Sequence, residues 1–300
     1  MSLSFDATLC RALARELDRR LHGRRTRAVF FDRRTPALQL VLADGALRFR
    51  LGPADAGLDL IDGDPGDPPA AARTLPCRVG AVEALADERI LRVHLQRVRG
   101  SVRHRKLVIE LAGNRANAFL LEGEQGVVRH ALRSRPDGPR PLMVGRPWTP
   151  PPPSTRLGVG GAAELGREGF AALLDELRAA AAVDEAALRS GLLRRLAWAS
   201  RLNADALAAL VVAGRDDDAW ALWTALADPP EGGAGILEHP TAGPHPYPMP
   251  LPGHAFRPTG SLLEAFLATA PAPADGAAPR PRADAGALLP GALLERLEAA

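Results

Sequence analysis

The chain has 300 residues, of which 46% are apolar and only 4% aromatic, so its core must consist mainly of Leu, Val and Ala. The length predicts more than one domain. The formal charge is +3, and Lys106 is the only lysine, so almost every cation is a guanidinium that can form two hydrogen bonds to a phosphate. This composition suits RNA binding, although a GC-rich genome that replaces Lys by Arg would produce the same bias.

Several kinds of function are not indicated by the side chains present. Cys10 and Cys77 show no CxxC spacing, and no apolar run resembles a signal peptide or a membrane span, so we expect a cytoplasmic protein without a membrane partner. The seven histidines never show the i, i+4 or HxH spacing typical of metal sites. GxSxG, P-loop, HExxH and paired-carboxylate motifs are missing as well. We therefore expect neither an enzyme nor a metal or cofactor.

Residues 7–21 are predicted to form an amphipathic helix that begins after Ser4 or Asp6. Its core stripe consists of leucines at every fourth position, namely Leu9, Leu13, Leu17 and Leu21. The opposite stripe consists of three arginines, namely Arg11, Arg15 and Arg19. A solvated face is the favoured interpretation of the arginines, with phosphate contact as the second.

The sequence between residues 27 and 132 changes to short runs of alternating or continuous apolar residues, which predict strands. These runs are residues 28–31, 37–42, 46–51, 89–95, 106–111, 117–121 and 127–132. Asp44-Gly45 is a good hairpin turn. Because most runs are not separated by a helix of crossover length, we expect an antiparallel sheet whose strands neighbour one another in sequence order. The expected fold class is α+β.

The proline run at residues 150–153 predicts the end of a β domain spanning residues 1–153. Residues 160–228 predict a helical domain, in which Asn203 follows a short turn and is expected to cap a helix. Residues 229–270 are a Pro/Gly-rich return segment with one short helix near its end. Residues 271–300 resemble a linker followed by the start of a possible coiled coil.

Three segments, taken in order, resemble the NFACT amino-terminal domain, also called the fibronectin-binding protein A amino-terminal domain. The first joins Ser4-Phe5-Asp6 to the leucine-striped helix and GRRTRAVFF, the second comprises residues 78–95 and 105–133, and the third is VGRPWTPPPP at residues 144–153. Within the helices, Ser200-Arg201-Leu202-Asn203 resembles the family's Gly-x-Ser-Pro helix-hairpin-helix turn without its glycine. The resemblance implies a glycosylase-like β fold followed by a helix-hairpin-helix-like domain.

The same resemblance implies a function in ribosome-associated quality control. Such a factor binds the large ribosomal subunit, with its rRNA, and tRNA, and it supports template-independent alanine tailing of stalled nascent chains. The ribosome supplies the peptidyl-transfer chemistry, so the factor needs surfaces that bind RNA and no catalytic residues. This implication agrees with the missing enzyme motifs.

The family's RNA-binding positions fall on two places in this chain. Glu88-Arg89 matches an Asp-Arg pair that engages tRNA, and Asn114, Arg115 and Asn117 fall on an Arg-His-Ser-Asn loop. Here Glu88 is one methylene longer than aspartate, and the family's Leu-Arg-Lys helix before residue 78 is missing. The alternative interpretation of Glu88-Arg89 is a surface salt bridge worth about 0–1 kcal/mol.

Arg103, Arg105 and Lys106 surround His104 and are the remaining candidates for RNA binding. Three cations beside His104 can bind phosphates, and they can equally form the exposed rim of a hairpin.

Three alternative functions remain open. A diverged or truncated paralogue would bind only RNA or the ribosome, without supporting tailing. An adhesin, as the fibronectin-binding label suggests, would require an export signal. A DNA glycosylase of the similar fold would need an amino-terminal Pro-Glu and zinc-finger cysteines, whereas this chain begins Met1-Ser2-Leu3.

Overall fold

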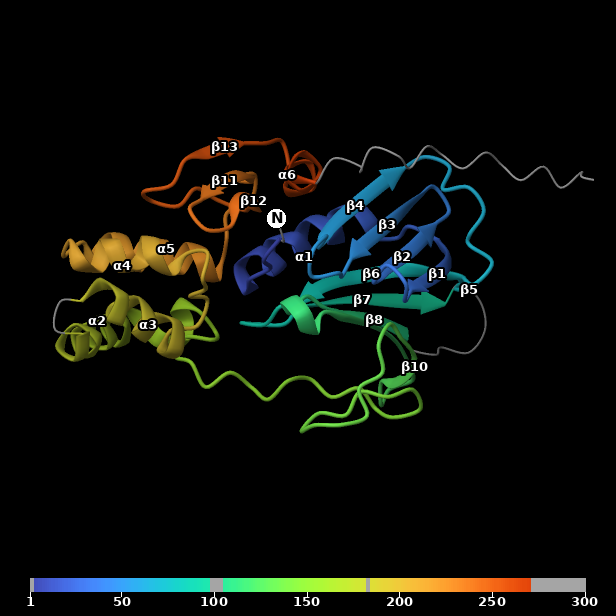
Figure 1. Cartoon of the computed structure of the whole chain (residues 1–300), viewed down its shortest axis with the longest axis horizontal. Helices are drawn as coiled ribbons and strands as arrows, with labels where there is room; N and C mark the ends of the chain where they lie inside the picture. The colour runs from blue at the N-terminus through green and yellow to red at the C-terminus, as the bar shows by residue number, and fades with distance from the viewer. Residues whose placement is uncertain (1–2, 98–104, 182–183, 271–300) are drawn as a thin grey trace, which may run out of the picture. The chain divides into compact units, whose positions relative to one another are not determined.

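Two five-stranded antiparallel sheets, a three-stranded sheet and six α-helices occur in the computed structural model, which describes residues 3–97, 105–181 and 184–270 (Figure 1). The predicted α+β class is confirmed. Arg103 and the predicted linker at 271–300 lie outside the described residues. Residues from the first sheet to the last helix belong to one compact unit, Met1–Ala270. The predicted domain boundary at residue 153 stays a prediction.

The predicted amino-terminal helix is confirmed as α1 (Ala7–Leu21). Asp6 is its N-cap, since its Oδ1 accepts a hydrogen bond from the Leu9 amide at 2.7 Å. The four leucines of the predicted stripe are buried and face the inner sides of both large sheets. They therefore anchor one aliphatic core that α1 shares with these sheets and with α6 (Leu262–Thr269).

The first sheet has the strand order β4-β3-β2-β1-β5. Its strands are β1 (Thr26–Asp32), β2 (Ala37–Leu42), β3 (Gly45–Arg50), β4 (Gly57–Asp62) and β5 (Arg73–Thr74). The predicted turn at Asp44 joins β2 to β3, which pair in antiparallel register. Inward residues such as Leu40, Leu47 and Phe49 are buried in the core, which explains the period-2 pattern of these runs.

The second sheet has the strand order β10-β9-β8-β7-β6, so sequence neighbours pair as predicted. Its strands are β6 (Cys77–Ala84), β7 (Ile90–Arg97), β8 (Arg105–Glu110), β9 (Asn117–Glu122) and β10 (Val127–Ala131). Residues 133–148 cover its outer face with Leu142 and Trp148, which pack on Val108, Phe119 and Val128. The expectation of a single sheet was wrong, because the predicted strands fall into two separate sheets. The strands β4, β5 and β6, which lie in the sequence between β3 and β7, were not recognised among the apolar runs.

The predicted helical region is confirmed as four helices (Figure 1). They are α2 (Ala162–Ala181), α3 (Glu185–Arg195), α4 (Ala204–Val212) and α5 (Asp216–Ala227). Asn203 occupies the N-cap position of α4 but does not cap it, so that prediction is wrong. Its Oδ1 accepts from the Ser200 amide at 2.8 Å, and its Nδ2 donates to the Trp198 carbonyl and the Tyr247 hydroxyl, each at 3.1 Å. The amide thus fixes the turn before α4, whose likeness to a helix-hairpin-helix stays a prediction.

The Pro/Gly-rich segment after α5 forms a third sheet, which the sequence did not predict. Its strands are β11 (Gly235–His239), β12 (Gly243–Tyr247) and β13 (Phe256–Pro258), in the order β12-β11-β13. Pro244 and Pro246 lie in β12, which is an edge strand and can therefore lack amide donors on its free side. The short helix expected near residue 262 is confirmed as α6, with Ser261 as its N-cap.

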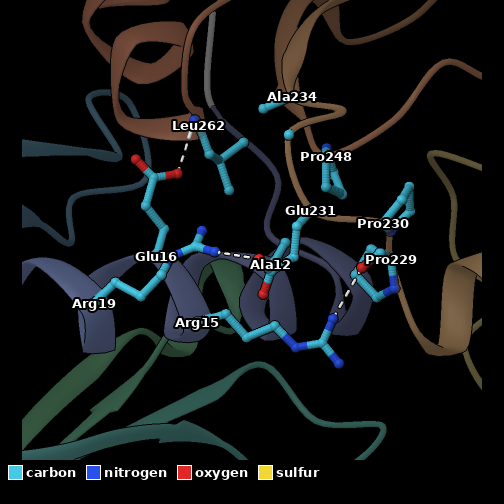
Figure 2. A pocket seen from close by; sticks show the side chains of 11 residues that line it. Ala12, Arg15, Glu16, Arg19, Pro229, Pro230, Glu231, Ala234, Pro248 and Leu262 are labelled. Atoms are coloured by element: carbon cyan, nitrogen blue, oxygen red, sulfur yellow. Dashed lines mark hydrogen bonds and ion pairs between the residues drawn. The ribbon is translucent and has the colours of Figure 1, made fainter.

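The arginine face of α1 packs on the end of α5 and on the segment that follows it (Figure 2). Arg11 donates to the Ala227 carbonyl and lies over the Trp198 ring, with its guanidinium carbon 5.0 Å from the ring centroid. Arg15 donates to the Pro229 carbonyl at 2.9 Å, and Arg19 pairs with Glu231 at 2.6 Å. The stripe therefore forms intramolecular contacts at the surface: Arg19 and Glu231 remain exposed, which confirms the solvated face in part, and phosphate contact stays a prediction.

A buried polar cluster joins the start of the chain to the third sheet and to the turn before α4. Asp6 accepts hydrogen bonds from the Ser200 hydroxyl at 2.7 Å and the Tyr247 hydroxyl at 3.0 Å. His245 accepts from the Ser4 amide at 3.1 Å through Nε2 and, as a neutral ring, donates from Nδ1 to the Pro246 carbonyl at 2.9 Å. The two ring nitrogens of His245 can form both of these hydrogen bonds only when the imidazole is neutral.

Stability is expected to fall as the pH drops below about 6.5, and His245→Gln should remove part of that loss. Burial lowers the pKa of His245 in the folded chain, so protons bind the unfolded chain more readily and favour unfolding below its ordinary pKa. A single such group contributes at most about 1.4 kcal/mol per pH unit. Urea unfolding between pH 8 and about pH 5 measures this slope. The exposed His22→Gln is the control, and equal slopes for both variants would contradict the assignment.

Candidate nucleic-acid interface

Three elements bring the predicted RNA-binding residues to one end of the second sheet. Ile90 at the start of β7 pairs with Glu110 at the end of β8, which pairs with Asn117 at the start of β9. The short 3-10 helix η1 (Gly113–Arg115) connects β8 to β9 at this end. The Leu111 amide donates to the Arg89 carbonyl at 2.7 Å. Glu88-Arg89 and the loop with Asn114 and Arg115 are therefore neighbours, although about 25 residues separate them in sequence.

Four arginines gather at this end, which we call the arginine end: Arg89, Arg115, Arg133 and Arg135. Arg89 and Arg115 are exposed. Arg135 donates to the Arg115 carbonyl at 2.7 Å, and Arg133 to the Ala116 carbonyl at 3.4 Å. None of the four forms an ion pair with a carboxylate of the described chain. Their charges are consequently available to an anionic partner.

Arg133 and Arg135 were not predicted as site residues. They follow β10, and only the pairing of β10 with β9 brings them beside η1. Asn117 produces this approach: its Oδ1 accepts from the Arg133 amide and its Nδ2 donates to the Arg133 carbonyl, both at 2.9 Å. Asn117 is fully buried, so its role is to hold the arginine end together, and we do not expect it to contact RNA itself.

Asp87 connects the arginine end to the helices. Its side chain is fully buried and pairs with Arg156, whose Nε lies 3.0 Å from Oδ2. It also accepts from the Trp198 amide at 2.9 Å and the Ser154 hydroxyl at 2.8 Å. Its φ of 54° is the left-handed conformation that Asp and Asn tolerate better than most residues. The sequence drew attention to Glu88 and missed this neighbour.

Glu88 is half-buried and lines a groove of about 650 Å³ together with Arg92 and the proline run at 150–153. Burial and the neighbouring Asp87 raise the pKa of Glu88, and nearby arginines, Arg89 among them, partly offset that rise. Glu88 and Arg89 do not form an ion pair in the described structure, so the alternative interpretation as a surface salt bridge is not supported.

Arg105 and Lys106 lie at the opposite end of β8, away from η1. Arg105 pairs with Glu122 at 3.2 Å, and Glu122 also pairs with Arg129 at 2.8 Å. Lys106 is half-buried. These two candidates are therefore not part of the arginine end.

Among the described residues, no group of three or more His, Cys, Asp or Glu side chains is arranged so that it could hold a metal ion. The six helices of the described chain are also too short or too polar to cross a membrane.

The sequence matches neither a protein-family model nor a curated protein. Solved structures do match. The amino-terminal part of the fibronectin/fibrinogen-binding protein of Streptococcus suis is 15% identical with a TM-score of 0.66, covering 87% of this chain and 97% of that one. The fibrinogen-binding protein of Staphylococcus aureus is 15% identical, with a TM-score of 0.61 and coverages of 87% and 96%. The amino-terminal domain of the fibronectin-binding protein PavA of Streptococcus pneumoniae is 16% identical, with a TM-score of 0.55 and the same coverages.

The chain has the fold of the amino-terminal domain of fibronectin/fibrinogen-binding proteins. This finding agrees with the resemblance seen in the sequence at residues 4–153. At 15–16% identity the shared fold leaves function to the side chains of each protein. Function must therefore be inferred from the side chains of the arginine end.

Proposed function

We propose that this chain is an RNA-binding factor of ribosome-associated quality control that binds the large ribosomal subunit and tRNA. One observation carries the proposal: four arginines without carboxylate partners in the described chain converge at one end of the second sheet. Guanidinium groups bind phosphates well, and four of them provide a binding energy that depends on salt. Folded RNA is the polyanion that the NFACT resemblance indicates.

The positions of the residues that match the NFACT family's RNA-binding motifs support this proposal. Glu88-Arg89 and the loop at residues 113–117 are distant in sequence, yet they are neighbours through the β7-β8-β9 register. A shared binding surface requires this proximity. The factor would act in the cytoplasm without cofactor, and the ribosome would carry out peptide-bond formation during alanine tailing. A diverged paralogue that binds RNA without supporting tailing would use the same surface.

A second candidate function comes from the names of the structural neighbours, which are fibronectin- and fibrinogen-binding proteins. An adhesin would bind these glycoproteins and would not require RNA. We rank it second because the unpaired guanidinium groups of the arginine end favour a polyanion, although Met143 and Val144 are exposed next to Leu142, which pairs with Arg135.

Crosslinking in cells, followed by sequencing of the bound RNA, tests the proposal. We expect tRNA and large-subunit rRNA to be enriched with the wild-type chain and to be lost with Arg89→Glu/Arg115→Glu. Arg194→Glu, which reverses an exposed arginine on α3, should leave the enrichment unchanged. Recovery of no RNA, together with binding of immobilised fibronectin, would favour the adhesin instead.

A further inference from the structure

A second group of cations surrounds two aromatic rings where the first sheet meets β10. The rings of Phe31, at the end of β1, and His130, in β10, lie 6.3 Å apart between centroids and are tilted by 52°. Both side chains are partly exposed. The Arg33 guanidinium donates to the Ala131 carbonyl at 3.2 Å, which holds the β1–β2 turn against β10.

Two more arginines complete this group. Arg73 in β5 pairs with Val29 of β1, and Arg129 precedes His130 in β10 at an irregularity in the β9–β10 register. Arg33, Arg73 and Arg129 are all exposed. Arg129 shares the carboxylate of Glu122 with Arg105, whereas Arg33 and Arg73 have no carboxylate partner within the described residues. The group therefore has excess positive charge.

Nearby acids offset only part of this charge. Asp32 lies beside Arg33 in sequence, and its carboxylate accepts from the Arg34 and Thr35 amides and from the Thr35 hydroxyl without forming an ion pair in the described structure. Burial lowers the pKa of His130, and the nearby Arg73, Arg129 and Arg33 lower it further. The imidazole is consequently neutral at pH 7 and can stack on an aromatic partner without adding to the charge.

We propose that Phe31 and His130, with Arg33, Arg73 and Arg129 around them, form a platform that binds an unpaired stretch of RNA. Arginines alone would bind any polyanion. Partly exposed rings beside them add stacking, which only unpaired bases can use, because paired bases in a duplex already stack on one another. We call these five residues the stacking platform.

The position of the stacking platform relates it to the arginine end. Arg133 follows His130 by three residues, which is about 10 Å along an extended chain. An RNA whose folded part contacts the arginine end could therefore place its adjoining unpaired nucleotides on the rings. In this respect the inference deepens the proposed function and rests on it for the identity of the natural RNA. Binding of a short oligonucleotide can nevertheless be measured without ribosomes.

Fluorescence anisotropy with a labelled oligouridine and a blunt RNA duplex of equal length tests the platform on the full chain. We expect Phe31→Leu/His130→Leu to weaken oligouridine binding about tenfold, since stacking contributes strongly for each base, and to leave duplex binding within about twofold. Arg73→Glu should weaken both probes, because it removes charge and retains the rings. Arg194→Glu, on α3, is the matched control and should change neither.

Several outcomes would overturn the platform. These are failure of the wild-type chain to bind oligouridine, equal losses for both probes in the ring variant, and competition by polyglutamate as effective as that by oligouridine. Since Phe31 also packs on the core, thermal melting must show that the ring variant is folded, and Arg73→Glu provides a second variant on the surface. Oligouridine binding without tRNA or ribosome binding would contradict the proposed function while leaving the platform intact.

Discussion

Asp87→Asn is expected to lower the free energy of unfolding by about 3–5 kcal/mol, the largest effect of any single polar substitution considered for this chain. The change removes the negative charge that compensates Arg156 and weakens acceptance from the Trp198 amide and the Ser154 hydroxyl. Asparagine retains the size of the side chain and tolerates the left-handed backbone at this position. The loss would therefore report the electrostatic interaction and not backbone strain.

Urea unfolding of the wild-type and variant chains measures this loss. Asp137→Asn, at an exposed aspartate without a hydrogen bond or ion pair in the described structure, is the matched control and should change stability by less than about 0.5 kcal/mol. Combining Asp87→Asn with Arg156→Met should cost less than the sum of the single changes, because a buried charge is no longer left unpaired. A loss below about 1 kcal/mol for Asp87→Asn alone would show that the pair does not hold the β strands to the helices.

Arg115→Glu/Arg135→Glu is expected to weaken tRNA binding at least tenfold and to reduce its dependence on salt. Both guanidinium groups lie at the arginine end without carboxylate partners in the described chain, and Arg135 touches the Arg115 backbone. Each phosphate contact contributes about 0.7–0.9 to the slope of log affinity against log salt concentration, so losing two should flatten the slope by about 1.4–1.8.

Filter binding of tRNA over a series of salt concentrations measures both quantities. Arg20→Glu/Arg194→Glu changes the net charge by the same amount at two exposed arginines on α1 and α3. A loss of affinity in this control as large as in the arginine-end variant would mean that tRNA responds only to net charge. A change confined to Arg115 and Arg135 would locate the phosphate contacts.

Local patterns predicted the elements whose burial repeats regularly. The leucines of α1 and the alternating residues of β3 and β7 have a one-sided environment, so the periods 3.6 and 2 survive in the sequence. The third sheet escaped prediction because Pro244 and Pro246 suggest a loop, whereas an edge strand accommodates them. The period of a run also carries no information about how many sheets the runs form.

Contacts between distant residues explain the remaining differences. The intramolecular contacts of the α1 arginines were not predicted because their partners, residues 227–231, follow more than 200 positions later. Likewise, the Asn203 side-chain amide donates a hydrogen bond to the distant Tyr247 hydroxyl and does not cap α4. Arg133 and Arg135 join the candidate site only through the β9–β10 register. The family resemblance singled out Glu88, Arg89, Asn114 and Arg115, and the β7-β8-β9 register makes them neighbours, which the sequence did not predict.

The central claim is that the arginine end binds ribosomal and transfer RNA. Co-sedimentation of the purified chain with large ribosomal subunits at low ionic strength tests this claim most directly. We expect the wild-type chain to pellet with the subunits and Arg89→Glu/Arg115→Glu to remain in the supernatant. A wild-type chain that stays in the supernatant while remaining folded, or a charge-reversal variant that pellets as fully as the wild type, would contradict the claim.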